Sequence, residues 1–175
     1  MIETETFREG VNLNLVKAIE GFNRIDDVEV VSGIVEGRSA DYPDGTSVAT
    51  VALAQHEGTE NIPSRPWVAI AFDNNLDVMR KQMDNAIDNV LFRRTKIDQA
   101  LSRVGQRVLV SQRKALADLD TPPLSPRTVR KKAADRASGR KPKSSLGYPV
   151  DKPLVETQHL FDQHVFLVRG HRRNS

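Results

Sequence analysis

The stretch from Ala54 to Trp67, AQHEGTENIPSRPW, comes nearest in this chain to a metal-binding or catalytic pattern. His56 and Glu57 begin like H-E-x-x-H, in which two histidines one helical turn apart bind zinc. Here the fifth position is Glu60, and Gly58 is expected to end the helix before it. We therefore predict a polar helix end, in which the two side chains cap the helix, and no metal site.

No other segment carries a pattern typical of catalysis. The sequence has no G-x-S-x-G, no P-loop and no G-x-G-x-x-G. The Asp26–Asp27 pair falls in a predicted turn, and His159, His164 and His171 fall in or beside the C-terminal segment. The chain has no cysteine, which excludes disulfides and thiolate metal sites. We predict a protein that is not an enzyme and has no catalytic residue, metal or cofactor.

Size and charge favour one domain with oppositely charged ends. The chain has 175 residues, of which 38% are hydrophobic and 28% charged. Residues 1–90 carry 7 basic and 16 acidic side chains, whereas residues 121–175 carry 12 basic and 4 acidic ones. Such ends suggest complementarity between copies, or an acidic partner for the basic part. We find neither a signal peptide nor an apolar run long enough to span a bilayer, and expect a soluble protein without a membrane partner.

The elements that position these residues follow from hydrophobic spacing. We predict a short helix from Val11 to Phe22, a strand from Val28 to Ile34, and a helix from Ser47 to Glu57 capped by Thr46 or Ser47. From Pro66 to residue 118 the spacing is that of an amphipathic helix, with Pro66 in its first turn. We expect a break between Phe92 and Thr95, and a weak point at Gly105.

The C-terminal third is rich in proline and basic residues. Ser125 and Pro126 are expected to open a helix that runs through Lys132, followed by a long loop over residues 137–149 and a closing strand from His164 to Val168. The fold class is therefore α+β, a small antiparallel sheet packed against long amphipathic helices, with an extended basic loop. Within one domain we separate an N-terminal helix and strand (1–45), a helical core (46–120), the basic extended loop (121–155), and a C-terminal strand and tail (156–175).

Four segments, in order, resemble the virion-morphogenesis and tail-completion (neck) proteins of tailed phages. AQHEGTENIPSRPW is similar to the helix, glycine and I-P-A-R-P-F run of that family, and LSRVGQRVLVSQRKAL to its second long helix. TPPLSPRTVRKK resembles its P-P-L-S-x-x-T-x-x-x-K element, and KPLVETQHLFDQHVFLV resembles its K-P-L-x-D-T-G-x-L-x-x-S-I close. This chain departs from the pattern at four places: Trp67 replaces Phe, Glu156 replaces Asp, Gln158 replaces Gly, and Gln163-His164 replace Ser-Ile.

The resemblance implies a structural role without catalysis. Such proteins act at the head–tail junction or the top of the tail, in a ring that is commonly sixfold, so we expect a hexameric ring in the virion, assembled in the host cytoplasm. The expected partners are connector or adaptor proteins and the tail tube or terminator. The docking candidates are Ile62, Pro63, Arg65, Pro66, Trp67, Leu124 and Leu154. Arg65 would bridge carboxylates, so that Arg65→Ala would impair assembly more than folding, and Trp67 would lie either in an interface or in the core of one subunit.

Two alternatives remain open. One is a tail terminator or head–tail adaptor ring, a neighbour in the same particle. The other is a basic protein that binds nucleic acid without sequence preference, through phosphates only, because Tyr148 is the one aromatic residue nearby. The basic candidates, facing either DNA in the lumen or a protein partner, are Arg127, Arg130, Lys131, Lys132, Arg136, Arg140, Lys141 and Lys143.

Overall fold

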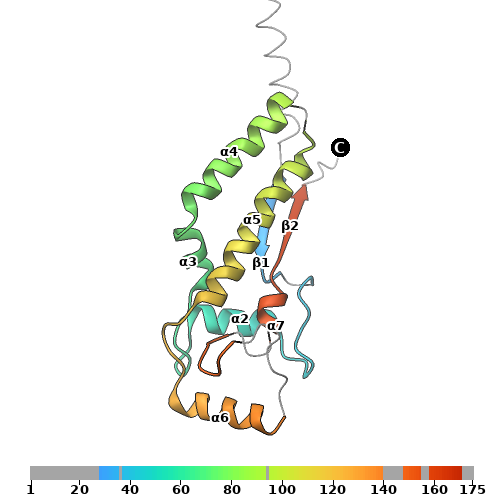
Figure 1. The fold of residues 1–175 in the computed structure, drawn as a ribbon. Helices are drawn as coiled ribbons and strands as arrows, with labels where there is room; N and C mark the ends of the chain where they lie inside the picture. The colour runs from blue at the N-terminus through green and yellow to red at the C-terminus, as the bar shows by residue number, and fades with distance from the viewer. Residues whose placement is uncertain (1–27, 36, 94, 140–147, 155–157, 171–175) are drawn as a thin grey trace, which may run out of the picture. The chain divides into compact units, whose positions relative to one another are not determined.

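The computed structural model describes residues 28–35, 37–93, 95–139, 148–154 and 158–170 (Figure 1). Its two strands pair in one antiparallel sheet, and the predicted α+β class is confirmed. The elements are β1 (Val28–Gly33), α2 (Val48–Glu57), α3 (Trp67–Asp73), α4 (Leu76–Arg93), α5 (Ile97–Asp118), α6 (Pro126–Ala137), α7 (His159–Asp162) and β2 (Val165–Gly170). The predicted N-terminal helix and the loop over 140–147 lie outside the described residues.

The described residues group into two compact units. The first unit holds residues 28–31, 76–107 and 167–170. Helix α4 buries Met79, Ala86, Val90 and Leu91. A cavity of about 110 Å³ in this unit is lined only by apolar side chains of β1, α4 and α5, namely Val28, Val30, Met83, Ala86, Ile87, Val90, Ile97 and Leu101. The apolar faces of strand and helices therefore meet, as amphipathic periodicity requires.

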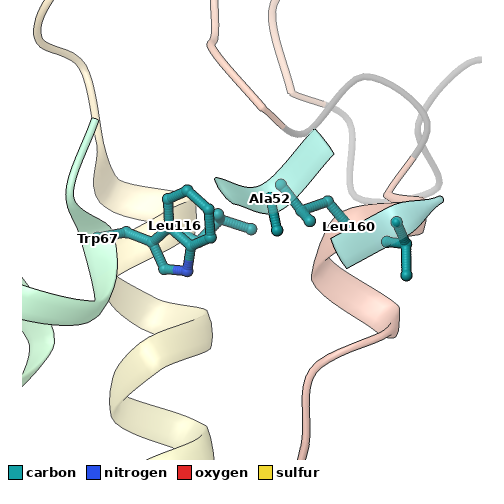
Figure 2. Close-up of a cluster of buried hydrophobic side chains, with 5 residues drawn as sticks. Ala52, Trp67, Leu116 and Leu160 are labelled. Carbon is teal, nitrogen blue, oxygen red and sulfur yellow. The ribbon is translucent and has the colours of Figure 1, made fainter. Parts of the chain in front are cut away.

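The second unit holds residues 32–35, 37–75, 108–139, 148–154 and 158–166 and contains the candidate site. Its core gathers side chains from four helices, α2, α3, α5 and α7: Val48, Ala52, Trp67, Leu116 and Leu160. Figure 2 shows the indole of Trp67 beside Leu116, with Ala52 and Leu160 in the same cluster. Since Trp67 and Leu116 are 2% and 0% exposed, their burial supplies a large share of this unit's hydrophobic stabilisation.

Local sequence signals locate several boundaries correctly. Helix α2 begins after Ser47, whose side chain accepts a hydrogen bond from the backbone N–H of Thr50, and ends at Gly58, which has a φ of +84°. The predicted break between Phe92 and Thr95 is confirmed, because α4 ends at Arg93 and α5 begins at Ile97. Ser125 caps α6 through the N–H of Thr128, with proline in the first turn.

Other boundaries differ from the prediction. The expected long helix is divided at Asn74 and Asn75, where the amide of Asn75 donates to the backbone oxygen of Ala71 and so competes with helix continuation. Pro66 is the N-cap residue of α3 and does not lie in its first turn. Gly105 does not interrupt α5, since this buried position rewards close packing more than helix propensity penalises it.

Candidate docking site

The site begins where the chain turns back at the end of α2. Gly58 lets the chain reverse, and the backbone N–H of Arg65 then donates to the carbonyl oxygen of Gln55 at 2.9 Å. The hydroxyl of Ser64 donates to the carbonyl oxygen of His56 at 2.7 Å. A Cβ at Gly58 would lie 2.7 Å from the backbone nitrogen of Ser64, so this close return requires glycine. The IPSRPW segment is thereby held against its own helix.

The guanidinium of Arg65 joins this segment to the proline pair that precedes α6. Its Nε and Nη2 donate to the carbonyl oxygen of Pro122 at 3.1 and 2.9 Å, and Nη2 also reaches the carbonyl oxygen of Pro123 at 3.4 Å. Its Nη1 donates to Oε1 of Gln55 at 3.4 Å. Arg65 is 3% exposed, and burial lowers the pKa of its guanidinium, which stays protonated at neutral pH.

The predicted role of Arg65 therefore needs correction. Among the described residues no carboxylate lies within ion-pair distance of it, and its acceptors are carbonyl oxygens of its own chain. Removing a buried group that satisfies several acceptors destabilises the folded chain directly. Arg65→Ala is therefore expected to weaken folding as well as assembly, because a backbone carbonyl 57 residues away accepts hydrogen bonds from this side chain.

A pocket of about 460 Å³ opens beside Arg65 and brings most of the docking candidates together. Ile62, Pro63, Arg65, Leu124 and Leu154 all line it. The pocket is also lined by Tyr42, Val51, Gln55, Asn61, Pro123, Ser125, Thr128, Lys132 and Leu160. Its volume lies within the usual range for ligand pockets, and its wall mixes apolar with polar and charged side chains. The arrangement suits recognition of an apolar segment that carries a charge.

Trp67 and Pro66 do not belong to this pocket. Trp67 is fully enclosed in the core, where its Nε1 donates to Nε2 of His164 at 2.9 Å. Pro66 is half-buried at the start of α3. Of the two roles considered for Trp67, the structure supports the core of one subunit, because a side chain that is 2% exposed offers almost no surface to a partner.

Sequence reasoning missed several residues of the pocket and its support. Tyr42, Gln55 and Leu160 line the pocket, and His164 accepts a hydrogen bond from Trp67. Burial, with a smaller contribution from Asp44, raises the pKa of the Tyr42 hydroxyl, which therefore stays protonated. The signal for Leu160 was present, since it lies within the quoted KPLVETQHLFDQH run, whereas Tyr42 gave no signal beyond its place in a turn.

The side chains of His56 and Glu57 contact each other, and His56 also contacts Trp67. Nδ1 of His56 lies 2.8 Å from Oε1 of Glu57, and the imidazole packs edge-on against the indole of Trp67 with 5.2 Å between ring centroids. The two side chains bond to one another rather than capping the helix, which ends through the N–H of Gly58. No group of three or more metal-ligating side chains occurs in the part of the chain that the structure describes.

The basic candidates lie on a helix where their placement is described. Arg127, Arg130, Lys131, Lys132 and Arg136 all belong to α6, which extends five residues beyond the predicted end at Lys132. The predicted helix through Lys132 is therefore confirmed, but it continues to Ala137, so that Arg136 also lies on the helix and not in the extended basic loop. Arg136 explains the extension in part, since its Nη1 donates to the carbonyl oxygen of Tyr148 and ties the last turn down. Arg140, Lys141 and Lys143 lie outside the described residues.

Two further observations bear on function. None of the helices in the described ranges is long and apolar enough to cross a membrane. Comparison of the chain with protein-family models, with curated protein sequences and with solved structures gives no match.

Proposed function

We propose that this chain is a structural protein of a tailed bacteriophage, acting in tail completion and head–tail joining as one subunit of a ring, with a hexamer as the expected assembly. The proposal rests on one observation, that segments far apart in the sequence meet at one pocket. Three of the segments that resemble neck proteins contribute Ile62, Leu124 and Leu154 to one pocket, although they are far apart in the sequence. The two polar links, Arg65 to Pro122 and Trp67 to His164, join the same segments.

The pocket fits a docking role for the neighbouring copy in a ring. A head-to-tail ring joins two different faces of identical subunits, so one face accepts what the other presents. The pocket wall mixes apolar and polar side chains, and Lys132 contributes a cationic side chain to it. The proposed occupant is an acidic segment from residues 1–90 of the next copy, the part of the chain with 16 acidic and 7 basic side chains.

Electron microscopy of particles made without this gene tests the proposal. For a neck protein we expect full heads and finished tails that fail to join, or that separate after joining. Tails of uncontrolled length would instead identify a terminator. Infectious particles of normal appearance would exclude a virion role altogether.

Complementation with two matched variants tests the pocket itself. Leu124→Arg places a charged side chain in the pocket wall, whereas Leu53→Arg changes an exposed leucine on α2 that does not line it. We expect Leu53→Arg to restore infectious particles and Leu124→Arg to fail, with both proteins folded by circular dichroism. Equal restoration by the two variants would exclude the pocket as a docking surface.

A further inference from the structure

Helix α6 carries a basic face that the pocket does not use. Arg127, Arg130 and Lys131 follow an i, i+3, i+4 spacing, which places them on one side of a helix. All three side chains are exposed, and we call them the front face. Neighbouring exposed positions on α6 hold Pro126, Thr128, Ala133 and Ala134. The front face therefore presents three cations and no large apolar or aromatic side chain.

The opposite side of α6 is fixed to the second unit. Nζ of Lys132 donates to the carbonyl oxygen of Lys152, and Nη1 of Arg136 donates to that of Tyr148, both at 3.1 Å. Val129 on the same side is half-buried. Lys132 and Arg136 therefore bind carbonyl oxygens of the chain itself, whereas the three front-face cations are directed outward.

The front-face cations lack carboxylate partners within the described residues. Other lysines of the same unit do have them, since Lys114 pairs with Asp118 and Lys152 pairs with Asp120. The one acidic residue of α6 is Asp135, which follows Lys131 by four positions, and among the described residues no ion pair joins the two side chains. Three unpaired cations on a rigid helix produce a concentrated positive field that attracts a polyanion.

The composition of the front face favours the phosphate backbone of a duplex over other polyanions. Single-stranded nucleic acid is bound through aromatic side chains that stack on bases, and α6 has none. Acidic protein surfaces are usually bound around aromatic or apolar anchors, which the front face also lacks. We propose that the front face of α6 binds double-stranded DNA through its phosphates, without sequence preference. This inference goes beyond the proposed function and does not depend on it.

Fluorescence anisotropy with a short labelled DNA duplex, in a salt series, tests this inference on the full chain. Three phosphate contacts predict a slope of about −2.7 in the logarithm of the binding constant against the logarithm of salt concentration. The triple variant Arg127→Ala, Arg130→Ala, Lys131→Ala should lose about tenfold or more in affinity at low salt and most of this slope. Duplexes of unrelated sequence should bind equally well.

A matched variant controls for net charge. Arg80→Ala, Lys81→Ala, Arg93→Ala removes three exposed cations from α4 and should keep nearly the wild-type affinity. Equal weakening by both triple variants, no binding by the wild-type chain, or displacement of the duplex by an equal charge of polyglutamate would each overturn the inference. Circular dichroism is used to check that both variants are folded. Since the test uses purified protein, its failure is distinct from failure of the neck role, which is read from particles.

Discussion

The indole Nε1 of Trp67 donates a hydrogen bond to Nε2 of His164 at 2.9 Å, inside the core of the second unit. Nδ1 of His164 lies 2.8 Å from the carbonyl oxygen of Leu160, which only accepts, so Nδ1 carries the proton. Nε2 is then free to accept from the indole. The imidazole is therefore neutral, and each of its nitrogens has a partner.

This bond pairs two of the departures from the neck-protein pattern that the sequence resembles. Trp67 stands where that pattern has Phe, and His164 stands where it has Ile. Either polar side chain alone would bury an unsatisfied nitrogen, whereas together they satisfy each other. The two residues therefore satisfy each other's polar groups although they are 97 positions apart.

A double-mutant cycle tests this coupling. Trp67→Phe leaves Nε2 of His164 without its donor, and His164→Ile leaves the indole N–H without its acceptor, so each should lower the free energy of unfolding by about 1–3 kcal/mol. The double variant should recover part of that loss, because both polar groups are gone. Urea unfolding measures all four proteins. Simple additivity of the two single losses would mean that the bond contributes nothing specific.

Stability should fall in weak acid because of His164. Burial, chiefly, lowers the pKa of its imidazole below 6.5, and the charge of Arg113 adds to the effect. As the pH falls below 6.5, the unfolded chain binds a proton before the folded chain does. Above pH 6.5 this group therefore leaves the free energy of unfolding unchanged. Between pH 6.5 and the folded-state pKa the free energy of unfolding decreases as the pH falls, by at most about 1.4 kcal/mol per pH unit.

Urea midpoints measured between pH 8 and pH 5 test this dependence, with the double variant Trp67→Phe, His164→Ile as the control. We expect the variant's midpoint to change less across this window than that of the wild type. Asp44 does not interfere, since its pKa is lowered from 3.8, chiefly by the backbone N–H of Thr46, and its effect falls in stronger acid. An identical pH profile for both proteins would assign the acid sensitivity to other groups.

Arg65 should contribute strongly to the stability of the folded chain. Arg65→Ala leaves the carbonyl oxygen of half-buried Pro122 without its donors, at a cost of about 1–3 kcal/mol for the lost bonds. Arg65→Lys should recover little, because one ammonium group does not reproduce the two parallel bonds of a guanidinium. The exposed Arg38 provides the control, and Arg38→Ala should unfold at the wild-type urea concentration. Wild-type stability of Arg65→Ala would contradict the structural role assigned here.

Two glycines with nearly the same positive φ test an added Cβ with and without a close contact. Gly58 and Gly45 have φ values of +84° and +82°, so alanine at either position adopts an unfavourable positive φ, at about 1–2 kcal/mol. A Cβ at Gly45 meets nothing within 4 Å, whereas at Gly58 it would lie 2.9 Å from the carbonyl oxygen of Ile62. Gly58→Ala should therefore destabilise the chain by about 1–3 kcal/mol more than Gly45→Ala. Thermal unfolding of the two variants gives the comparison.

Much of the secondary structure was predictable because its signals are local. Ser47 before α2, Gly58 after it, and the Ser125-Pro126 start of α6 act on backbone groups within a few residues. The division between α3 and α4 escaped prediction, since hydrophobic spacing continues across Asn74 and Asn75 while the Asn75 amide takes the carbonyl oxygen of Ala71. Gln158 shows the converse, because it adopts a φ of +59° where the resembled pattern has glycine.

The sequence by itself determined the fold class, the positions of several helix ends, and five of the residues that line the pocket, since periodicity, caps and motif order are properties of neighbouring residues. Only the tertiary structure decided what those residues do. Arg65 proved to bind carbonyl oxygens and not carboxylates, and Trp67 proved to belong to the core. The physical reason is that burial and hydrogen-bond partners depend on segments 57 and 97 residues away, and no local pattern records that distance.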